Sequence, residues 1–385
     1  MFKKIAVLGA GHGGHAMSAE LSMVGYEVNL YELPEFADNI KPIIEKGGIH
    51  LIARRPPAEE YQLPAGGKTG FTKITGKVTS DIKEALDGVD LIMLVVPSPW
   101  RERFIKECAP YLRDGQTIVI WPARFASIQC ANLLKSMGVD KDILICETQS
   151  LIYACKRTGP AQVLVKDFKR KLLTSAFPAG RTNEALEMLK GIYPQLTPAK
   201  NILETTFSSG AIVLHPTSTL VNLYRVDAKF YPYYEEIGGP FIRCYDVTPA
   251  MARVMEAVDK ERLAIADKLG VKVLSLKDTL GVFYLATGKD LYETILNVPT
   301  YQKQLAPTSL NHRYVTEDVP YNLVPCALLG DQLQVPTPTI RAMTTIGCAA
   351  TGRDFWSEGL TMEKLGLAGR TAKEIMEYAE TGVWG

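Results

Sequence analysis

The chain has 385 residues and is 46% hydrophobic, which is enough apolar material for the cores of two domains of ordinary size. Its 43 Lys and Arg residues nearly balance 42 Asp and Glu residues, so it lacks the basic excess that neutralises a phosphate backbone. No apolar stretch approaches the roughly 20 residues that a membrane span requires. We therefore expect neither nucleic acid nor membrane among its partners.

The first residues and the cysteines both predict a cytoplasmic protein. Residues 1–4 read MFKK and lead directly into an apolar run, without the small-residue cleavage site of a secretory signal. The seven cysteines are odd in number and include no C-x-x-C pair, so they indicate neither a disulfide framework nor a zinc site. The histidines lack a ligand spacing such as H-x-x-x-H, and we predict no metal centre.

The first half of the chain has the alternating pattern of a parallel sheet with helices between its strands. Apolar residues 3–8 predict a strand, residues 15–24 have helical spacing, and residues 27–31 predict a second strand. A strand, a glycine turn, a helix and a strand in about thirty residues form the unit that builds such sheets. Further apolar runs predict strands over residues 89–96, 116–121, 142–147 and 171–177. We expect a doubly wound parallel sheet of the Rossmann type.

After about residue 200 the sequence changes to long stretches with helical spacing, notably residues 249–269 and 275–297. Two Pro-rich interruptions are expected to be structured loops, over residues 318–325 and 335–338. The sequence therefore predicts two domains. Residues 1–200 would form an α/β dinucleotide-binding domain, and residues 201–385 an all-α substrate and catalytic domain.

Residues 9–14 read GAGHGG and fit the pattern G-x-G-x-x-G between the first predicted strand and the first predicted helix. The glycines permit a tight turn, close approach of the backbone to a pyrophosphate, and close packing of helix on strand. Unpaired N–H groups at the start of the helix would bind the phosphates. We predict cofactor contacts from Gly9, Gly11, His12, Gly13 and Gly14.

Glu32 follows the second predicted strand about 20 residues after the glycine motif, where an acid accepts hydrogen bonds from the adenosine ribose. Because a carboxylate there repels a 2′-phosphate, the sequence favours NAD over NADP. NADP stays open, since an Arg or Lys from a neighbouring loop can override one acid. Val96, Pro97 and Ser98 close another strand, at whose carboxyl end the nicotinamide half is expected; a simple strand cap is the alternative.

His215 is the leading candidate for a proton donor in the second domain. It follows an apolar run and precedes Pro216, a helix breaker, so we expect its ring at the edge of a pocket. Reduction of a carbonyl or imine needs a proton donor matched to hydride delivery, and imidazole has an ordinary pKa of roughly 6.5. The alternative is a histidine satisfied within the core.

A second polar cluster lies in residues 313–321 (RYVTEDVPY), which we expect to form a loop. A carboxylate from this cluster could orient His215 and stabilise its protonated form. Arg313 could clamp a substrate carboxylate in bidentate fashion. The alternative is a surface salt bridge between Arg313 and Glu317 or Asp318.

Several stretches together resemble the opine dehydrogenase family, of the octopine and nopaline dehydrogenase type, over nearly the whole chain. They are residues 9–14, residues 147–155 (ETQSLIYAC), His215 with Pro216, Asn222, residues 258–262 (VDKER) and, most specifically, residues 313–320 (RYVTEDVP). The resemblance implies a dinucleotide-binding domain followed by an all-helical domain. It also implies that NAD(P)H drives the reductive condensation of an amino acid with a 2-oxo acid such as pyruvate.

The same resemblance implies roles for individual residues. The family's catalytic pair corresponds to His215 and Asp318, its carboxylate-binding arginine corresponds to Arg313, and Asn222 is expected at the substrate. The sequence departs from the family in one place, because it reads PAR where the family usually carries a Pro-Gly turn. Arg124 at that place could be a second clamp on the oxo-acid carboxylate, or could cap a helix.

Two other functions stay open. A reductase of the glycerol-3-phosphate or ketopantoate type is similar in architecture, but it generally relies on a helical lysine that has no equivalent we can identify here. A sensor that binds NAD(H) without turnover would leave Arg313 and Asp318 without a purpose. The amino acid, the 2-oxo acid and the physiological direction are not predicted, and a homodimer is one option for the assembly.

Overall fold

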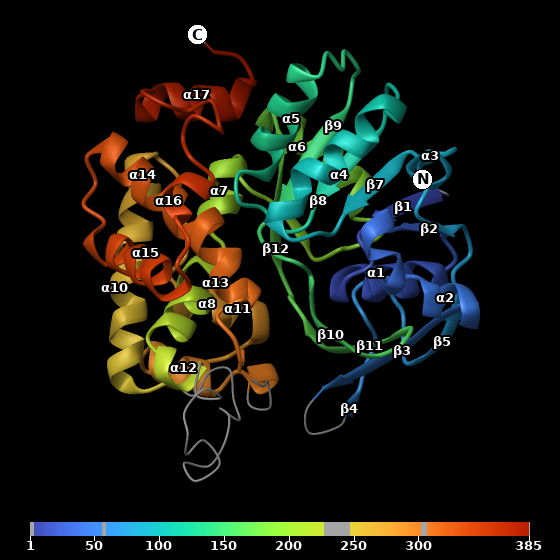
Figure 1. Ribbon diagram of the computed structural model, residues 1–385, viewed down its shortest axis with the longest axis horizontal. Helices are drawn as coiled ribbons and strands as arrows, with labels where there is room; N and C mark the ends of the chain where they lie inside the picture. The colour runs from blue at the N-terminus through green and yellow to red at the C-terminus, as the bar shows by residue number, and fades with distance from the viewer. Residues whose placement is uncertain (1–3, 56–58, 227–246, 302–305, 385) are drawn as a thin grey trace. The chain divides into compact units, whose positions relative to one another are not determined.

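The computed structural model describes residues 4–55, 59–226, 247–301 and 306–384 (Figure 1). The chain divides into two compact units, one formed by Met1–Thr205 with Ala379–Val383 and the other by Thr206–Tyr378 with Trp384–Gly385. The first unit is an α/β structure and the second has helices but no strand among its described residues, which confirms the predicted fold class. No helix in the described part of the chain is long and apolar enough to cross a membrane.

The first unit is built on an eight-stranded sheet with the strand order β13-β12-β9-β8-β7-β1-β2-β6. Its strands are β1 (Lys4–Leu8), β2 (Glu27–Tyr31), β6 (Val78–Thr79), β7 (Leu91–Leu94), β8 (Thr117–Ile120), β9 (Leu144–Thr148), β12 (Leu172–Phe177) and β13 (Leu196–Pro198). The run from β6 to β9 pairs in parallel. The order in which successive strands are added to the sheet therefore reverses beside β1. Doubly wound folds bind their ligands at such a reversal.

Two strands of this sheet differ from the all-parallel expectation, because β12 pairs antiparallel with β9 and β13 runs parallel to β12. Between β9 and β12 the chain forms a hairpin of β10 (Tyr153–Gly159) and β11 (Gln162–Phe168). A parallel return would need a crossover connection, usually a helix, and the hairpin supplies none. The hairpin joins β3 (Gly48–Arg55), β4 (Glu59–Glu60) and β5 (Gly70–Lys73) in a second sheet that the sequence analysis did not predict.

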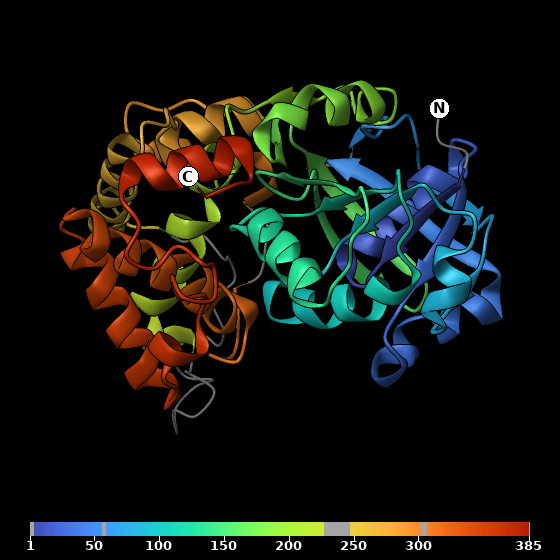
Figure 2. The same cartoon turned by 90° about the horizontal axis from the view of Figure 1, so that it is seen from above.

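Helix α1 (His12–Met23) lies between the two sheets, where it contacts β1 and β2 of the first and β3, β10 and β11 of the second. Residues 13–22 are consequently buried on every side. The helix begins earlier than the predicted residue 15, since Gly13 and Gly14 already belong to its first turn. Figure 2 shows α4 (Arg101–Cys108) and α5 (Ala126–Ser136) along one side of the first sheet and α6 (Thr182–Leu189) along the other.

A buried carboxylate, Glu20, fastens α1 to the loop that precedes β5. Its side chain is 0% exposed, and Oε1 accepts hydrogen bonds from the backbone N–H groups of Ala65 (2.7 Å) and Gly67 (3.3 Å). Its Oε2 accepts a 2.5 Å bond from the Tyr153 hydroxyl, which lies 2.8 Å from the hydroxyl of Tyr193. Burial raises the pKa of Glu20 from 4.5 to about 7, and these hydrogen bonds only partly oppose that rise.

Glu20→Gln is expected to remove a pH dependence of stability. Between pH 4.5 and about pH 7 the unfolded chain ionises this carboxyl while the folded chain retains the proton, so stability falls as pH rises through that window. The raised pKa corresponds to a loss of roughly 3 kcal/mol. Gln keeps the acceptor toward Ala65, so the variant should gain urea resistance relative to the parent as pH rises.

The control is Glu187→Gln on α6, which removes an exposed carboxyl from the same unit. The urea midpoint of this variant should match that of the parent at every pH. Parallel urea midpoints for the parent and Glu20→Gln from acid to neutral pH would show that Glu20 does not hold the proton.

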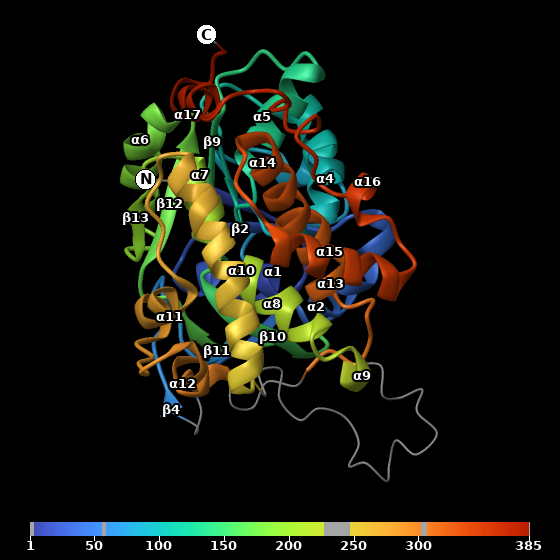
Figure 3. The same ribbon diagram turned by 90° about the vertical axis from the view of Figure 1, so that its left-hand side faces the viewer.

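The second unit is organised around the long helix α10 (Pro249–Lys268), which packs most extensively against three other helices (Figure 3). These are α8 (Ala211–Leu220), α14 (Val324–Leu333) and α15 (Pro338–Thr351). The stretch predicted as one helix over residues 275–297 forms two, α11 (Leu276–Tyr284) and α12 (Leu291–Leu296). The interruption begins at Leu285, whose φ of 59° is left-handed and ends α11.

The predicted loop over residues 318–325 is wrong, because this segment is helical. A π-helical turn, η7 (Val319–Leu323), continues directly into α14. Pro320 and Pro325 each lie in the first turn of their helix, where a missing N–H group costs nothing. The prolines were therefore start signals for helices and not signs of a loop.

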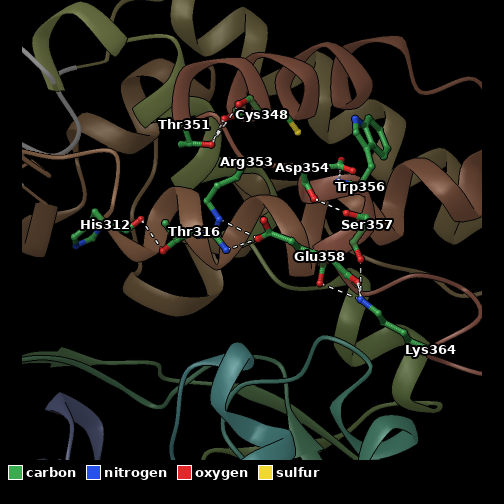
Figure 4. A network of polar contacts seen from close by, with 12 residues as sticks. His312, Thr316, Cys348, Thr351, Arg353, Asp354, Trp356, Ser357, Glu358 and Lys364 are labelled. Atoms are coloured by element: carbon green, nitrogen blue, oxygen red, sulfur yellow. Dashed lines mark hydrogen bonds and ion pairs between the residues drawn. The ribbon is translucent and has the colours of Figure 1, made fainter.

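A network of polar contacts holds α16 (Phe355–Glu358) and the segments on either side of it, as Figure 4 shows. The Lys364 ammonium donates to the last carbonyl groups of α16, at 3.0 Å from that of Ser357 and 3.0 Å from that of Glu358. The Glu358 carboxylate in turn binds the Arg353 guanidinium. Just beyond α16, the Leu360 N–H donates to the Pro320 carbonyl at 2.9 Å. The segment after α15 thereby fixes the position of η7.

Candidate active site

His215 lies inside α8, at a place where the sequence analysis expected Pro216 to end a helix. The helix instead continues to Leu220. Nearly all of its side chains are buried, so tertiary packing outweighs the one backbone hydrogen bond that the proline removes. The His215 carbonyl accepts the hydroxyls of Ser218 (3.0 Å) and Thr219 (2.9 Å).

The structure brings His215 and Asp318 into contact. Nδ1 of His215 lies 2.9 Å from Oδ2 of Asp318, and the Asn322 side-chain amide donates to the other carboxylate oxygen at 2.8 Å. The Asp318 side chain is 1% exposed and that of His215 is 16% exposed. A carboxylate on Nδ1 fixes the ring tautomer, so any proton exchange of this ring with a substrate would take place at Nε2.

The ring of Tyr314 packs against the face of the His215 ring. The two rings are stacked, with centroids 3.9 Å apart and planes 11° apart. The ring of His312 lies edge-on to the Tyr314 ring, with centroids 4.5 Å apart, and its Nδ1 accepts the backbone N–H of Tyr314 at 3.3 Å. His312 is thus the N-cap of α13 (Arg313–Thr316). The sequence analysis did not single out Tyr314 or Asn322.

Arg313 lies one residue before Tyr314 on α13, with a side chain that is 54% exposed. Its Nη1 is 3.6 Å from Oε2 of Glu317, a carboxylate that is only 2% exposed. The ion pair named as the alternative is therefore present, although its acid is buried. An exposed guanidinium on the same short segment as Asp318 is also open to a substrate carboxylate, and that role stays a prediction.

Asn222 follows the end of α8. Its side-chain amide donates to the Ser218 carbonyl at 2.8 Å and contacts the Met251 sulfur at 3.4 Å. Among the described residues, no hydrogen bond joins the Asn222 side chain to His215 or to Asp318. Its place at the substrate stays a prediction.

Arg124 lies in the first unit, beyond the carboxyl end of β8. Its backbone φ is 95°, which L-residues rarely adopt, and its side chain is 3% exposed. Nη1 donates to the hydroxyl of Ser98 at 3.0 Å. Two residues predicted separately are thus neighbours at the ends of β7 and β8, the edge where the nicotinamide half is expected.

Two buried charges that the sequence analysis missed support this edge. Arg101 is 1% exposed and donates to the carbonyl of Ala123 at 2.7 Å. Glu147 is 0% exposed and accepts the N–H of Ser127 (2.8 Å) in the first turn of α5 and the hydroxyl of Thr205 (2.6 Å). Burial raises the pKa of Glu147, and these hydrogen bonds oppose that rise. Its place within the family-like stretch of residues 147–155 was the signal available in the sequence.

The glycine loop fits a dinucleotide. Gly9 has a φ of +99°, and a Cβ there would lie 2.4 Å from Cγ1 of Val96. A Cβ on Gly14 would lie 1.8 Å from the Gly9 carbonyl oxygen, and one on Gly13 would meet side chains within 3 Å. Gly11 is exposed and a Cβ there would meet nothing within 4 Å, so its backbone is open to a pyrophosphate.

Glu32 lies directly after β2 and is 5% exposed. It accepts the N–H of Ala10 (3.0 Å), the N–H of Leu33 (3.0 Å) and the side-chain amide of Asn39 (3.1 Å). The acid is therefore joined to the glycine loop through the N–H of Ala10. His12 is the exposed first residue of α1.

The chain is similar to known proteins over both of its units. Residues 198–351 match the family model described as NAD/NADP octopine/nopaline dehydrogenase, alpha-helical domain. The chain is 33% identical over 380 residues to an opine dehydrogenase from Arthrobacter sp. (strain 1C), with 98% of this chain and 99% of that protein covered.

Two solved structures are similar in fold. Octopine dehydrogenase with NADH and L-arginine has a TM-score of 0.74 at 21% identity, covering 99% of this chain and 98% of that one. Yersinopine dehydrogenase with NADP⁺ has a TM-score of 0.69 at 17% identity, covering 98% of this chain and 97% of that one.

Proposed function

The chain belongs to the opine dehydrogenase family, and from that premise we propose that His215, oriented by Asp318, handles the proton of its reaction. It is an NAD(P)-dependent dehydrogenase that acts on CH–NH groups, and it condenses an amino acid reductively with a 2-oxo acid. The observation that carries the proposal is the 2.9 Å contact between Nδ1 of His215 and Oδ2 of Asp318.

The reaction needs proton transfers at two stages. The amino group attacks the oxo-acid carbonyl only as the free amine, and loss of water then requires a proton on the departing hydroxyl. His215 Nε2 removes the first proton and returns one to the hydroxyl, giving the protonated imine. A nicotinamide cofactor held at the glycine loop would supply the hydride that reduces this imine to the secondary amine. In the opposite direction His215 acts as the base, on the secondary amine or on the water that hydrolyses the imine.

Two arginines would position the oxo acid. Arg313 offers a half-exposed guanidinium on the segment that carries Asp318, which suits bidentate binding of a carboxylate. Arg124 beside Ser98 would be the second clamp, and Asn222 a further contact. A substrate carboxylate held at fixed points brings the reacting carbon to the nicotinamide in a defined orientation.

Arg313→Gln is expected to raise the KM for the 2-oxo acid by roughly ten- to a hundredfold, with a smaller effect on kcat. The variant removes the guanidinium while it keeps a long polar side chain. A matched control is Arg370→Gln, because Arg370 also pairs with a glutamate four residues later, Glu374, at 3.0 Å. Steady-state kinetics that show equal KM values in both variants would exclude Arg313 from carboxylate binding.

The function is tested by following the absorbance of NADH or NADPH with pyruvate and a panel of amino acids. Oxidation that requires both an oxo acid and an amine supports the proposed condensation. Oxidation with an oxo acid alone would make the protein a carbonyl reductase. Nucleotide binding without turnover would make it a sensor.

We also propose that the enzyme works in the cytoplasm as a homodimer. The six cysteines among the described residues are free thiols, which suits a reducing compartment. Light scattering after gel filtration distinguishes the dimer from a monomer.

A further inference from the structure

An arginine from the second sheet lies at the ribose end of the cofactor site. Arg157 of β10 donates from Nη1 to the side-chain oxygen of Asn39 at 2.7 Å and to the carbonyl of Ala10 at 3.3 Å. Its backbone N–H also donates to Nδ1 of His12 at 3.2 Å. Asn39 in turn donates to Glu32, so its amide joins the arginine to the acid.

Glu32 has little capacity left for the ribose hydroxyls. Its two oxygens offer about four acceptor positions, and three are taken by Ala10, Leu33 and Asn39. One further hydrogen bond is possible, whereas an acid that selects an unmodified ribose commonly receives both hydroxyls. In this chain Glu32 therefore serves mainly to order the loop around it.

Arg157 keeps much of its binding capacity. Within the described part of the chain, no carboxylate lies within ion-pair distance of its guanidinium, and Nε and Nη2 have no hydrogen-bond partner. Its side chain is partly exposed. A guanidinium held by one nitrogen, with further N–H groups accessible, has the donor geometry that binds phosphate.

We propose that Arg157 and Asn39 form the subsite that holds the 2′-phosphate when NADP(H) binds, so that Arg157 determines the affinity for NADPH relative to NADH. The positive charge of Arg157 offsets the negative charge of Glu32, so the net charge of the site repels neither the unmodified ribose nor the ribose 2′-phosphate. The arginine of this subsite lies on β10, far along the chain from the glycine motif. The inference rests on the proposed function only for the presence of a nicotinamide dinucleotide.

The test is calorimetric titration of the full chain with NADH and with NADPH, and with 5′-AMP and adenosine 2′,5′-bisphosphate as shorter probes. The parent should bind the two dinucleotides with affinities within about tenfold of each other. Arg157→Gln should weaken NADPH and the bisphosphate by roughly ten- to a hundredfold, as expected for one charge-assisted contact, and NADH by far less. Arg157→Lys should recover part of the loss.

Lys156→Gln is the matched control, because it removes an equal charge from the neighbouring, exposed position on the same strand. It should leave both affinities unchanged. Equal losses of NADH and NADPH in Arg157→Gln would overturn the proposal, since they would show that Arg157 only supports the loop. A parent that binds NADPH more than about a hundredfold more weakly than NADH would overturn it too. NADH binding without opine formation would count against the proposed function and leave this subsite intact.

Discussion

His215→Asn is expected to lower kcat/KM for the reductive condensation by roughly a hundred- to ten-thousandfold, the usual contribution of one general acid–base group. Asparagine can still donate to Asp318 and fills part of the ring volume, but it cannot exchange a proton. Because His215 belongs to the second unit and the glycine loop to the first, NADH affinity should remain near that of the parent. Steady-state kinetics and calorimetry measure the two quantities.

His312→Asn is the matched control. His312 touches the same Tyr314 ring, and asparagine is also a good N-cap for α13, so this variant should keep most of the activity. Asp318→Asn should approach the loss of His215→Asn, because an amide no longer specifies the ring tautomer. Near-parental turnover by His215→Asn would assign the proton to another group.

Gly14→Ala is expected to abolish measurable dinucleotide binding and to destabilise the first unit. Its Cβ would lie 1.8 Å from the Gly9 carbonyl oxygen, and neither backbone segment can yield without moving the loop. Overpacking of this kind costs roughly 1–3 kcal/mol or more. Urea unfolding and NADH titration measure the two effects.

Two further glycines separate stability from binding. Gly11→Ala adds a methyl group where nothing lies within 4 Å, so stability should hold while binding falls, because the pyrophosphate needs that space. Gly180→Ala, also in open space but remote from the motif, should change neither. Normal NADH affinity in both Gly14→Ala and Gly11→Ala would remove the glycine motif from the cofactor site.

The parts of the fold that the sequence predicted are those specified locally. β1, α1 and β2 follow from apolar periodicity around one glycine turn, within residues 4–31. The second sheet escaped because its central pairing is not local: β11 pairs with β3, more than a hundred residues earlier. The prolines after Asp318 were misread because a proline permits a helix start as readily as a loop.

The site shows the same division. The glycine motif and Glu32 could be predicted from spacing, whereas His215 and Asp318 are 103 residues apart and were paired through the family resemblance. Tyr314 and Asn322 became recognisable only in three dimensions, because stacking and hydrogen bonding depend on how α8 meets α13 and η7.

Arg124 combines a strained backbone conformation with a buried charged side chain. At its φ of 95° any residue with a side chain bears a conformational cost of order 1–3 kcal/mol, and glycine would avoid it. This chain keeps the strained backbone together with a buried guanidinium. Backbone strain of this kind persists where the surrounding structure holds it in place, and it gathers at sites where the strained residue has a function. The strain at Arg124 therefore singles out this turn independently of the charge that it carries.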